Sequence, residues 1–133
     1  MTLEELELTL PSGLHDAILL RLAIDYGKRQ MSLDLDVDVG DPDAAHETAR
    51  EARRRACVTL SGLVFCVIDP PDPRYSFDTA GPLTIDSGTG EPDGAPGIHQ
   101  PVPQDAHLAW IFVSRWNAFI RFAAENATLD WLE

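Results

Sequence analysis

The sequence predicts a mainly β domain: a curved antiparallel sheet or half-barrel of about five or six strands with a short N-terminal helix. Two runs, 18–26 and 32–39, alternate apolar and polar residues with the period of two that is typical of half-buried strands. The aromatic C-terminal stretch has strand composition. A chain of 133 residues with 44% hydrophobic content has the size of one domain, which we assign to residues 1–133.

A short helix is expected at the N-terminus. Thr2 and Glu5 have the spacing of a capping box, in which the side chains satisfy backbone N–H groups of the first turn. The leucines at 3, 6 and 10 form one apolar stripe, and the Pro-Ser-Gly sequence at 11–13 ends it. Because a helix of about two turns is marginal alone, it must pack against the sheet.

The stretch 14–39 predicts a β-hairpin, introduced by His15 and Asp16. A four-residue loop, 27–30, joins its arms if Tyr26 closes against Met31. The resulting register sets these pairs opposite each other: Ile24 and Leu33, Leu22 and Leu35, and Leu20 and Val37 on the core face, and Arg21 and Asp36 on the solvent face. A slip of one residue would bury the aspartates, so the register should be well specified.

A long third strand is expected over 56–68, with Gly62 marking a bulge or a close backbone approach. Cys57 and Cys66 would then lie about 30 Å apart along one strand, too far for a disulfide. Two unpaired thiols favour the reducing cytoplasm. The arginines before this strand, Arg50 and 53–55, are expected to pair with aspartates of the neighbouring strand.

Residues 70–105 predict a long loop, because they contain eight of the ten prolines and five of the nine glycines. We expect a partly disordered or surface-hugging segment here rather than an active-site lid. Only 83–85 has strand character. Beyond it, 107–133 predicts further strands, with a turn at 116–118 and an interruption at 125–126.

The formal net charge of −12 limits the classes of partner. It disfavours nucleic acid, whose phosphates are neutralised by Lys and Arg, and it disfavours anionic membrane surfaces. It favours a basic protein partner. The first residues lack a basic and apolar leader, and no run approaches the roughly 20 apolar residues of a membrane span, so a cytoplasmic protein is expected.

Two stretches invite a chemical interpretation, and neither has the full pattern. His15-Asp16 could be the metal-binding pair of an HD-type phosphohydrolase, but it precedes a strand and lacks further spaced ligands. Asp34, Asp36 and Asp38 suggest a calcium loop, whose sixth and twelfth positions would be Val39 and Ala45 instead of Gly and Glu. We therefore expect no catalytic residue, no metal and no cofactor.

Four short segments resemble a group of small uncharacterised bacterial proteins. They are Leu14-His15-Asp16, Ile24-Asp25-Tyr26, Leu33-x-Leu35 and Leu60-Ser61-Gly62-Leu63, within residues 14–68. The pattern resembles YxiG-like domains and similar proteins placed near toxin systems and regarded as immunity factors. The resemblance implies an antiparallel β domain without known catalysis, in a partner-binding role. It carries over no functional residues and does not cover 70–105.

The expected function is non-enzymatic protein binding, as in an immunity-type factor that engages a basic protein. Its candidate partner-binding residues are His15, Asp16, Asp34, Asp36 and Asp38. The alternative is a small-ligand-binding or metal-dependent hydrolytic domain with a site near His15 and Asp16. A third possibility is a homo-oligomer that pairs its aromatic C-terminal surface.

Overall fold

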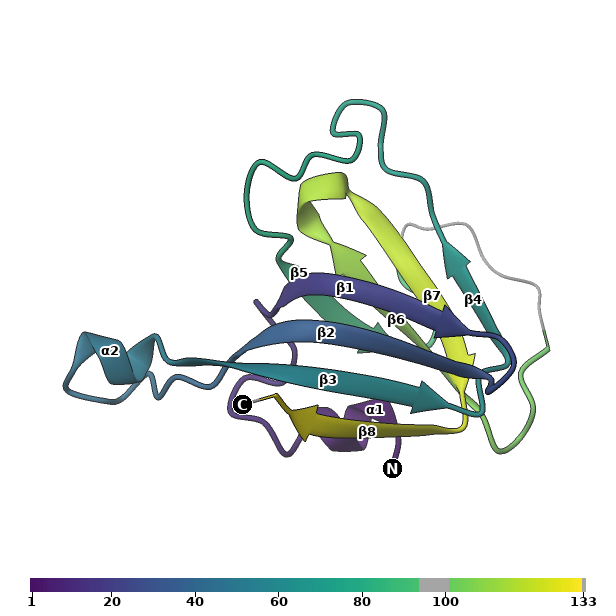
Figure 1. Cartoon of the computed structure of the whole chain (residues 1–133), viewed down its shortest axis with the longest axis horizontal. Coiled ribbons are helices and arrows are strands. Elements are labelled where there is room, and N and C mark those ends of the chain that lie inside the picture. The colour runs from purple at the N-terminus through teal and green to yellow at the C-terminus, as the bar shows by residue number, and fades with distance from the viewer. Residues whose placement is uncertain (94–100, 133) are drawn as a thin grey trace.

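The structure is a computed structural model, which describes residues 1–93 and 101–132. Two short helices, one 3-10 turn and eight strands follow each other along these residues (Figure 1). They are α1 (Leu3–Glu7), β1 (Ile18–Asp25), β2 (Gln30–Asp38), α2 (Glu47–Arg50), β3 (Arg53–Ser61), β4 (Phe65–Ile68), β5 (Ile85–Thr89), β6 (His107–Val113), η1 (Ser114–Trp116), β7 (Ala118–Ala124) and β8 (Asn126–Trp131).

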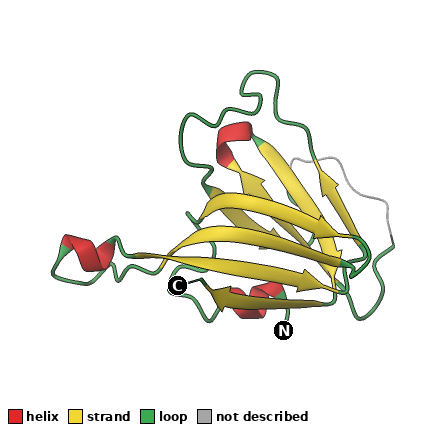
Figure 2. Cartoon of the chain, viewed as in Figure 1, coloured by secondary structure: helices red, strands yellow, loops and turns green. Residues whose placement is uncertain are grey.

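The strands form two antiparallel sheets of four, which lie one in front of the other (Figure 2). Sheet A has the order β1-β2-β3-β8, and sheet B has the order β4-β7-β6-β5. The mainly β prediction is confirmed. The described chain holds eight strands instead of five or six, and they divide between two sheets that do not close into a barrel.

The hydrophobic core lies between the sheets. On β2, four side chains are fully buried: Met31, Leu33, Leu35 and Val37. Sheet B contributes Ile85, Ile111, Val113 and Phe122, all at most 1% exposed. Burying one such side chain stabilises the fold by about 1.5–3 kcal/mol, so this layer supplies the main driving force for folding.

The predicted register of the first hairpin is wrong by two residues. Leu22 lies opposite Leu33, and Arg21 lies opposite Asp34. The loop still has four residues, 26–29, but it closes between Asp25 and Gln30. A bulge between Leu19 and Arg21 then turns Leu19 into the core and leaves Leu20 on the surface. Side chains alternate between the two faces of a strand, so a shift of two residues keeps each one on its face. The side chains of β2 that face the core are therefore the predicted ones.

The single strand expected over 56–68 is also wrong. The chain leaves sheet A after Ser61 and enters sheet B at Phe65, so Cys57 and Cys66 belong to different sheets. Both thiols are free, as expected. The turn uses Gly62, whose φ of +62° is unfavourable for residues with a Cβ atom.

A second sheet crossing lies beside the first. β7 ends at Ala124 in sheet B, and β8 begins at Asn126 in sheet A. Glu125, between them, donates its backbone N–H to the carbonyl oxygens of Ser61 at 3.0 Å and Gly62 at 3.2 Å. A Cβ atom on Gly62 would lie 2.6–2.7 Å from the Glu125 side chain, which confirms the close approach expected at this glycine.

Backbone hydrogen bonds join the two sheets at another edge. Leu19 donates its N–H to the carbonyl of Leu83, and Ile85 donates to that of Ala17, both at 2.9 Å. The Pro/Gly-rich segment is therefore partly structured, since it supplies β5 to sheet B. Of the loop predicted over 70–105, residues 94–100 lie outside the described part of the chain.

The terminal elements agree with the sequence. Thr2 caps α1 by accepting the Glu5 N–H at 3.1 Å, and the helix buries Leu3 and Leu6 next to β8. The turn before β7 contains Asn117 in a left-handed conformation. None of the described helices is long and apolar enough to cross a membrane.

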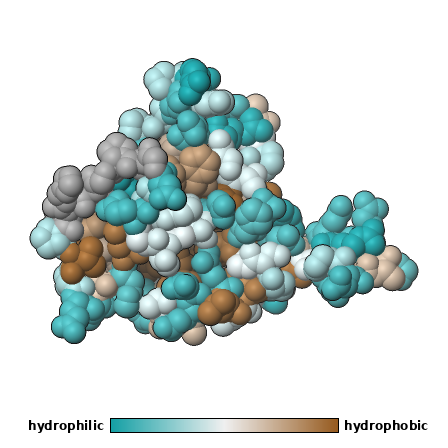
Figure 3. All heavy atoms as spheres, turned by 180° about the vertical axis from the view of Figure 1, so that it is seen from behind, coloured by the Kyte–Doolittle hydropathy of each residue, from teal (hydrophilic) through white to brown (hydrophobic). Residues whose placement is uncertain are grey.

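The hairpin of β2 and β3 extends beyond its neighbours as an arm that carries α2 (Figure 1). Its base is closed by the N–H of Val39 donating to Ala52 and that of Asp41 donating to Ala49, both at 2.9 Å. Seen from behind, the arm is mostly hydrophilic, whereas hydrophobic residues surface on the main body (Figure 3).

Substitution of Gly62 by alanine should destabilise the protein more than substitution of Gly90. Both glycines have positive φ, at +62° and +74°, so each variant should lose about 1–2 kcal/mol from the backbone conformation. Among the described residues, an added Cβ would meet a close neighbour at Gly62 and no atom within 4 Å at Gly90. Urea unfolding should show an extra loss of about 1–3 kcal/mol for Gly62→Ala. Equal losses would contradict the tight crossing.

Candidate functional site

The His15-Asp16 pair lies in the turn that leads into β1, and backbone contacts fix this turn. Asp16 has a φ of +61°, and its N–H donates to the carbonyl of Ile85 at 3.1 Å. The guanidinium of Arg53 donates two hydrogen bonds of 3.1 Å to the carbonyl oxygen of Asp16. The turn is therefore held between β3 and β5.

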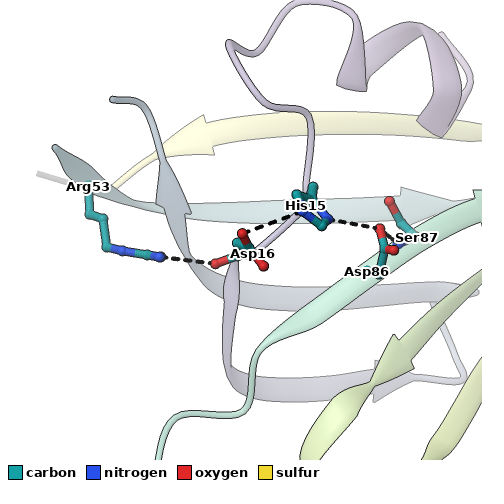
Figure 4. Close-up of polar contacts among 5 residues, drawn as sticks. All are labelled: His15, Asp16, Arg53, Asp86 and Ser87. Carbon is teal, nitrogen blue, oxygen red and sulfur yellow. Dashed lines mark hydrogen bonds and ion pairs between the residues drawn. The ribbon is translucent and has the colours of Figure 1, made fainter. Parts of the chain in front are cut away.

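His15 stands between two carboxylates (Figure 4). Its Nε2 lies 3.4 Å from Asp16 Oδ2, and its Nδ1 lies 3.4 Å from Asp86 Oδ1. All three side chains are more than half exposed. Contacts of this kind are worth about 0–1 kcal/mol, and water reaches the imidazole from outside. The cluster can attract a cationic group, but it has no enclosing walls that would position a substrate.

Ser87, next to Asp86, belongs to a different contact. Its hydroxyl donates to the Glu7 carboxylate of α1, and its backbone N–H donates to Asp86 Oδ1 at 2.9 Å. Burial raises the pKa of Glu7, although the hydrogen bond from Ser87 opposes this. Ser87 thus ties α1 to β5 and is not oriented as a nucleophile with His15 as its base.

Asp34, Asp36 and Asp38 lie on the outer face of sheet A. This stretch is strand β2, as the alternating pattern predicted against a calcium loop. Arginines face all three carboxylates: Arg21 lies 4.0 Å from Asp34, and the β2–β3 register sets Arg55 opposite Asp36 and Arg53 opposite Asp38. Of the arginines expected to pair with this strand, Arg53 and Arg55 lie opposite its aspartates. Arg50 instead donates to the carbonyl oxygens of Ala44 and Ala45, and Arg54 lies over the Trp131 ring. Much of the charge of the acidic strand is therefore compensated locally.

A different surface gathers carboxylates from two segments of the chain that contain neither Lys nor Arg. Residues 1–20 and 75–114 contain no Lys or Arg. The structure joins these segments through the Glu7–Ser87 hydrogen bond and the His15–Asp86 contact. We call the resulting surface the cation-poor face, and its carboxylates are Glu4, Glu7, Asp16 and Asp86. Arg53 reaches Asp16 and marks its border.

Sequence reasoning identified part of this face. His15 and Asp16 were candidates, but Glu4, Glu7 and Asp86 were not. The absence of Lys and Arg from two long segments was visible in the sequence, yet only the fold brings the segments together. Among residues 1–93 and 101–132, no three His, Cys, Asp or Glu side chains are placed to hold a metal ion.

The two thiols are protonated at neutral pH. Burial raises the pKa of Cys66 to about 11 and also raises that of Cys57. Because the thiolate is the reactive form, both cysteines are poor nucleophiles.

The aromatic C-terminal surface lies on the outer face of sheet B. Trp110 and Phe112 of β6 each contact the ring of Phe119 on β7, with centroids 5.6 and 4.9 Å apart. All three side chains are half-buried. Homo-oligomer formation through this surface stays a prediction.

Comparison with known proteins supports the fold alone. No family model matches the chain, and no curated protein matches it. A crystal structure of an uncharacterized protein from Neisseria gonorrhoeae is similar, with a TM-score of 0.50 and 16% sequence identity. The match covers 89% of this chain and 93% of that chain. The resemblance to YxiG-like domains stays a prediction.

The positive φ of Asp16 predicts that a glycine variant at this position is more stable than an alanine variant, which is the reverse of the usual order. At φ +61°, glycine is unstrained and alanine is not, so Asp16→Gly should be about 1–2 kcal/mol more stable than Asp16→Ala. Asp86 also contacts His15 but lies within β5, where Asp86→Gly should be the less stable variant by up to about 1 kcal/mol. Thermal and urea unfolding of the four variants tests this, and the same order at both positions would contradict it.

Glu7 predicts a specific pH dependence. Its pKa is raised in the folded state, so folding favours the protonated carboxyl, and wild-type stability declines as the pH rises through the carboxyl range. Glu7→Gln keeps an oxygen acceptor for Ser87 and has no proton to lose. Urea unfolding from pH 4 to 7 should show that the free energy of unfolding of the variant rises relative to that of wild type as the pH rises. If the difference in free energy of unfolding between the two proteins does not change with pH, the charge of Glu7 does not affect stability.

Proposed function

We propose that this protein is a non-enzymatic binding domain whose cation-poor face engages a basic protein partner. One observation carries the proposal: Glu7 and His15, from a segment without Lys or Arg (1–20), contact Ser87 and Asp86, from a second such segment (75–114). Carboxylates gathered in this way produce a field that extends about a Debye length, roughly 8 Å at physiological salt. Such a field accelerates association with a basic surface and disfavours acidic partners.

The location of the exposed groups supports this choice of face. His15, Asp16 and Asp86 project from the surface, with more than half of each side chain exposed. The aspartates of β2 are more buried and face arginines across the sheet. Their negative charge is therefore less available to a basic partner. Of the five residues expected from the sequence, His15 and Asp16 are therefore assigned to the partner surface.

Two finer expectations complete the proposal. The free thiols favour a cytoplasmic location. The resemblance to immunity-type domains predicts that the basic partner is a toxin encoded beside this protein.

Two variants with the same change in charge test the proposal. Glu4→Gln/Asp16→Asn/Asp86→Asn removes three negative charges from the cation-poor face. Asp34→Asn/Asp36→Asn/Asp38→Asn removes three from the outer face of sheet A. Wild type should capture a basic protein from the source lysate at low salt and release it as the salt rises. With the captured partner purified, the first variant should bind roughly three- to a hundredfold more weakly, at up to about 1 kcal/mol for each exposed charge.

The second variant is the matched control and should bind nearly as tightly as wild type. Capture of no basic protein at low salt would overturn the proposal. Equal weakening by the two variants would overturn the choice of face, because it would show that only net charge matters.

A further inference from the structure

A cavity of about 300 Å³ opens between α1 and one end of sheet B. Its walls are apolar and come from several elements, among them Leu60 of β3, Leu108 of β6 and Phe122 of β7. Its mouth is polar, with the exposed residues Glu4, Thr89 and His107. This volume lies at the lower end of the range for small-molecule sites. Neither His15 nor Asp16 lines it.

Small side chains create the space. Four alanines line the cavity, at positions 106, 109, 124 and 127, where the facing strands would otherwise bring larger residues together. Protein interiors are normally close-packed, so an apolar recess of this size that opens to solvent is an unusual feature of the fold. Engineered apolar cavities of about half this volume stay dry and bind small aromatic molecules. The alanine-lined cavity therefore has the physical properties of a ligand site.

The charge of the residues at the cavity mouth determines which polar group of a ligand is favoured there. Among the described residues, the lining includes one carboxylate, that of Glu4, and neither Lys nor Arg. The ammonium of Met1 donates to Asn126 at the same mouth, and the α1 carboxylates of Glu4 and Glu5 outnumber it. The local charge is negative, so a hydrogen-bond-donating, positively charged head is favoured and a carboxylate is repelled.

We propose that this cavity binds a small apolar organic amine, with its hydrocarbon part against Leu60, Leu108 and Phe122 and its ammonium near Glu4. The walls accept an aryl or branched alkyl group of about ten non-hydrogen atoms or fewer, given roughly 30 Å³ for each small polar or apolar unit. The site shares Glu4 with the cation-poor face, but its apolar walls contain neither His15, Asp16 nor Asp86, so ligand binding and partner binding can be tested independently.

Three probes of similar shape test the ligand class: 2-phenylethylamine, 2-phenylethanol and phenylacetate. Titrations followed by NMR of the methyl groups should place the amine at Leu60 and Leu108, with a millimolar or tighter Kd. The alcohol should bind about two- to fivefold more weakly, and the acid should bind more weakly still. Shifts confined to other parts of the protein, or an acid that binds as well as the amine, would overturn the proposal.

Paired variants locate the site. Ala124→Leu fills the cavity and should weaken amine binding at least tenfold without lowering the unfolding temperature. Ala23→Leu, on the outer face of sheet A, is the matched control and should bind like wild type.

Two surface variants keep the test decisive if Ala124→Leu does not fold. Glu4→Gln should weaken the amine about two- to fivefold and leave the alcohol unchanged. Glu5→Gln, one residue away on α1 and outside the lining, should have a smaller effect on the amine. If Glu4→Gln leaves the binding of the amine unchanged, the assigned role of the carboxylate is wrong.

Discussion

The two sheets depend on one corner, where the N–H of Glu125 donates to the carbonyl oxygens of Ser61 and Gly62. Both chain crossings between the sheets pass through this point. It fixes where β3 and β8 stop pairing on one side and where β4 and β7 start on the other. The apolar cavity lies beside it, since Leu60 and Asn126 line its wall. The relative position of the sheets, and with it the space between them, follows from a short length of backbone.

The sequence predicted strand faces better than it predicted pairing. Alternation identified the buried side of β2 because period two depends on local residues alone. It could not reveal that a loop of the same length closes between Asp25 and Gln30, which shifts the pairing by two residues, or that a bulge follows between Leu19 and Arg21. Nor could it divide 56–68 into two strands, since a run that is apolar on both faces looks the same in one long strand as in two short strands that belong to different sheets.

The surface features were less accessible to sequence reasoning, because they join distant segments. His15 is conspicuous beside Asp16, yet its second carboxylate comes from Asp86, 71 positions away. The cavity is harder still to foresee. Its alanines lie on β6, β7 and β8 and near the start of β6, and in sequence they look like weak strand formers. Only the fold shows that these alanines line one cavity next to α1.

The arm formed by β2, β3 and α2 has a practical consequence for protein engineering. Its tip, residues 41–51, buries no side chain, and its base is closed by one backbone hydrogen bond between Val39 and Ala52 and one between Asp41 and Ala49. Segments of this kind tolerate inserted sequence, because lengthening them leaves the core and its packing unchanged. A fluorescent domain or an affinity peptide inserted there would lie at the end of β3 opposite to Leu60 of the cavity. The arm is thus a natural attachment point for a label that reports ligand binding, and its base, where Arg53 reaches Asp16, adjoins the cation-poor face.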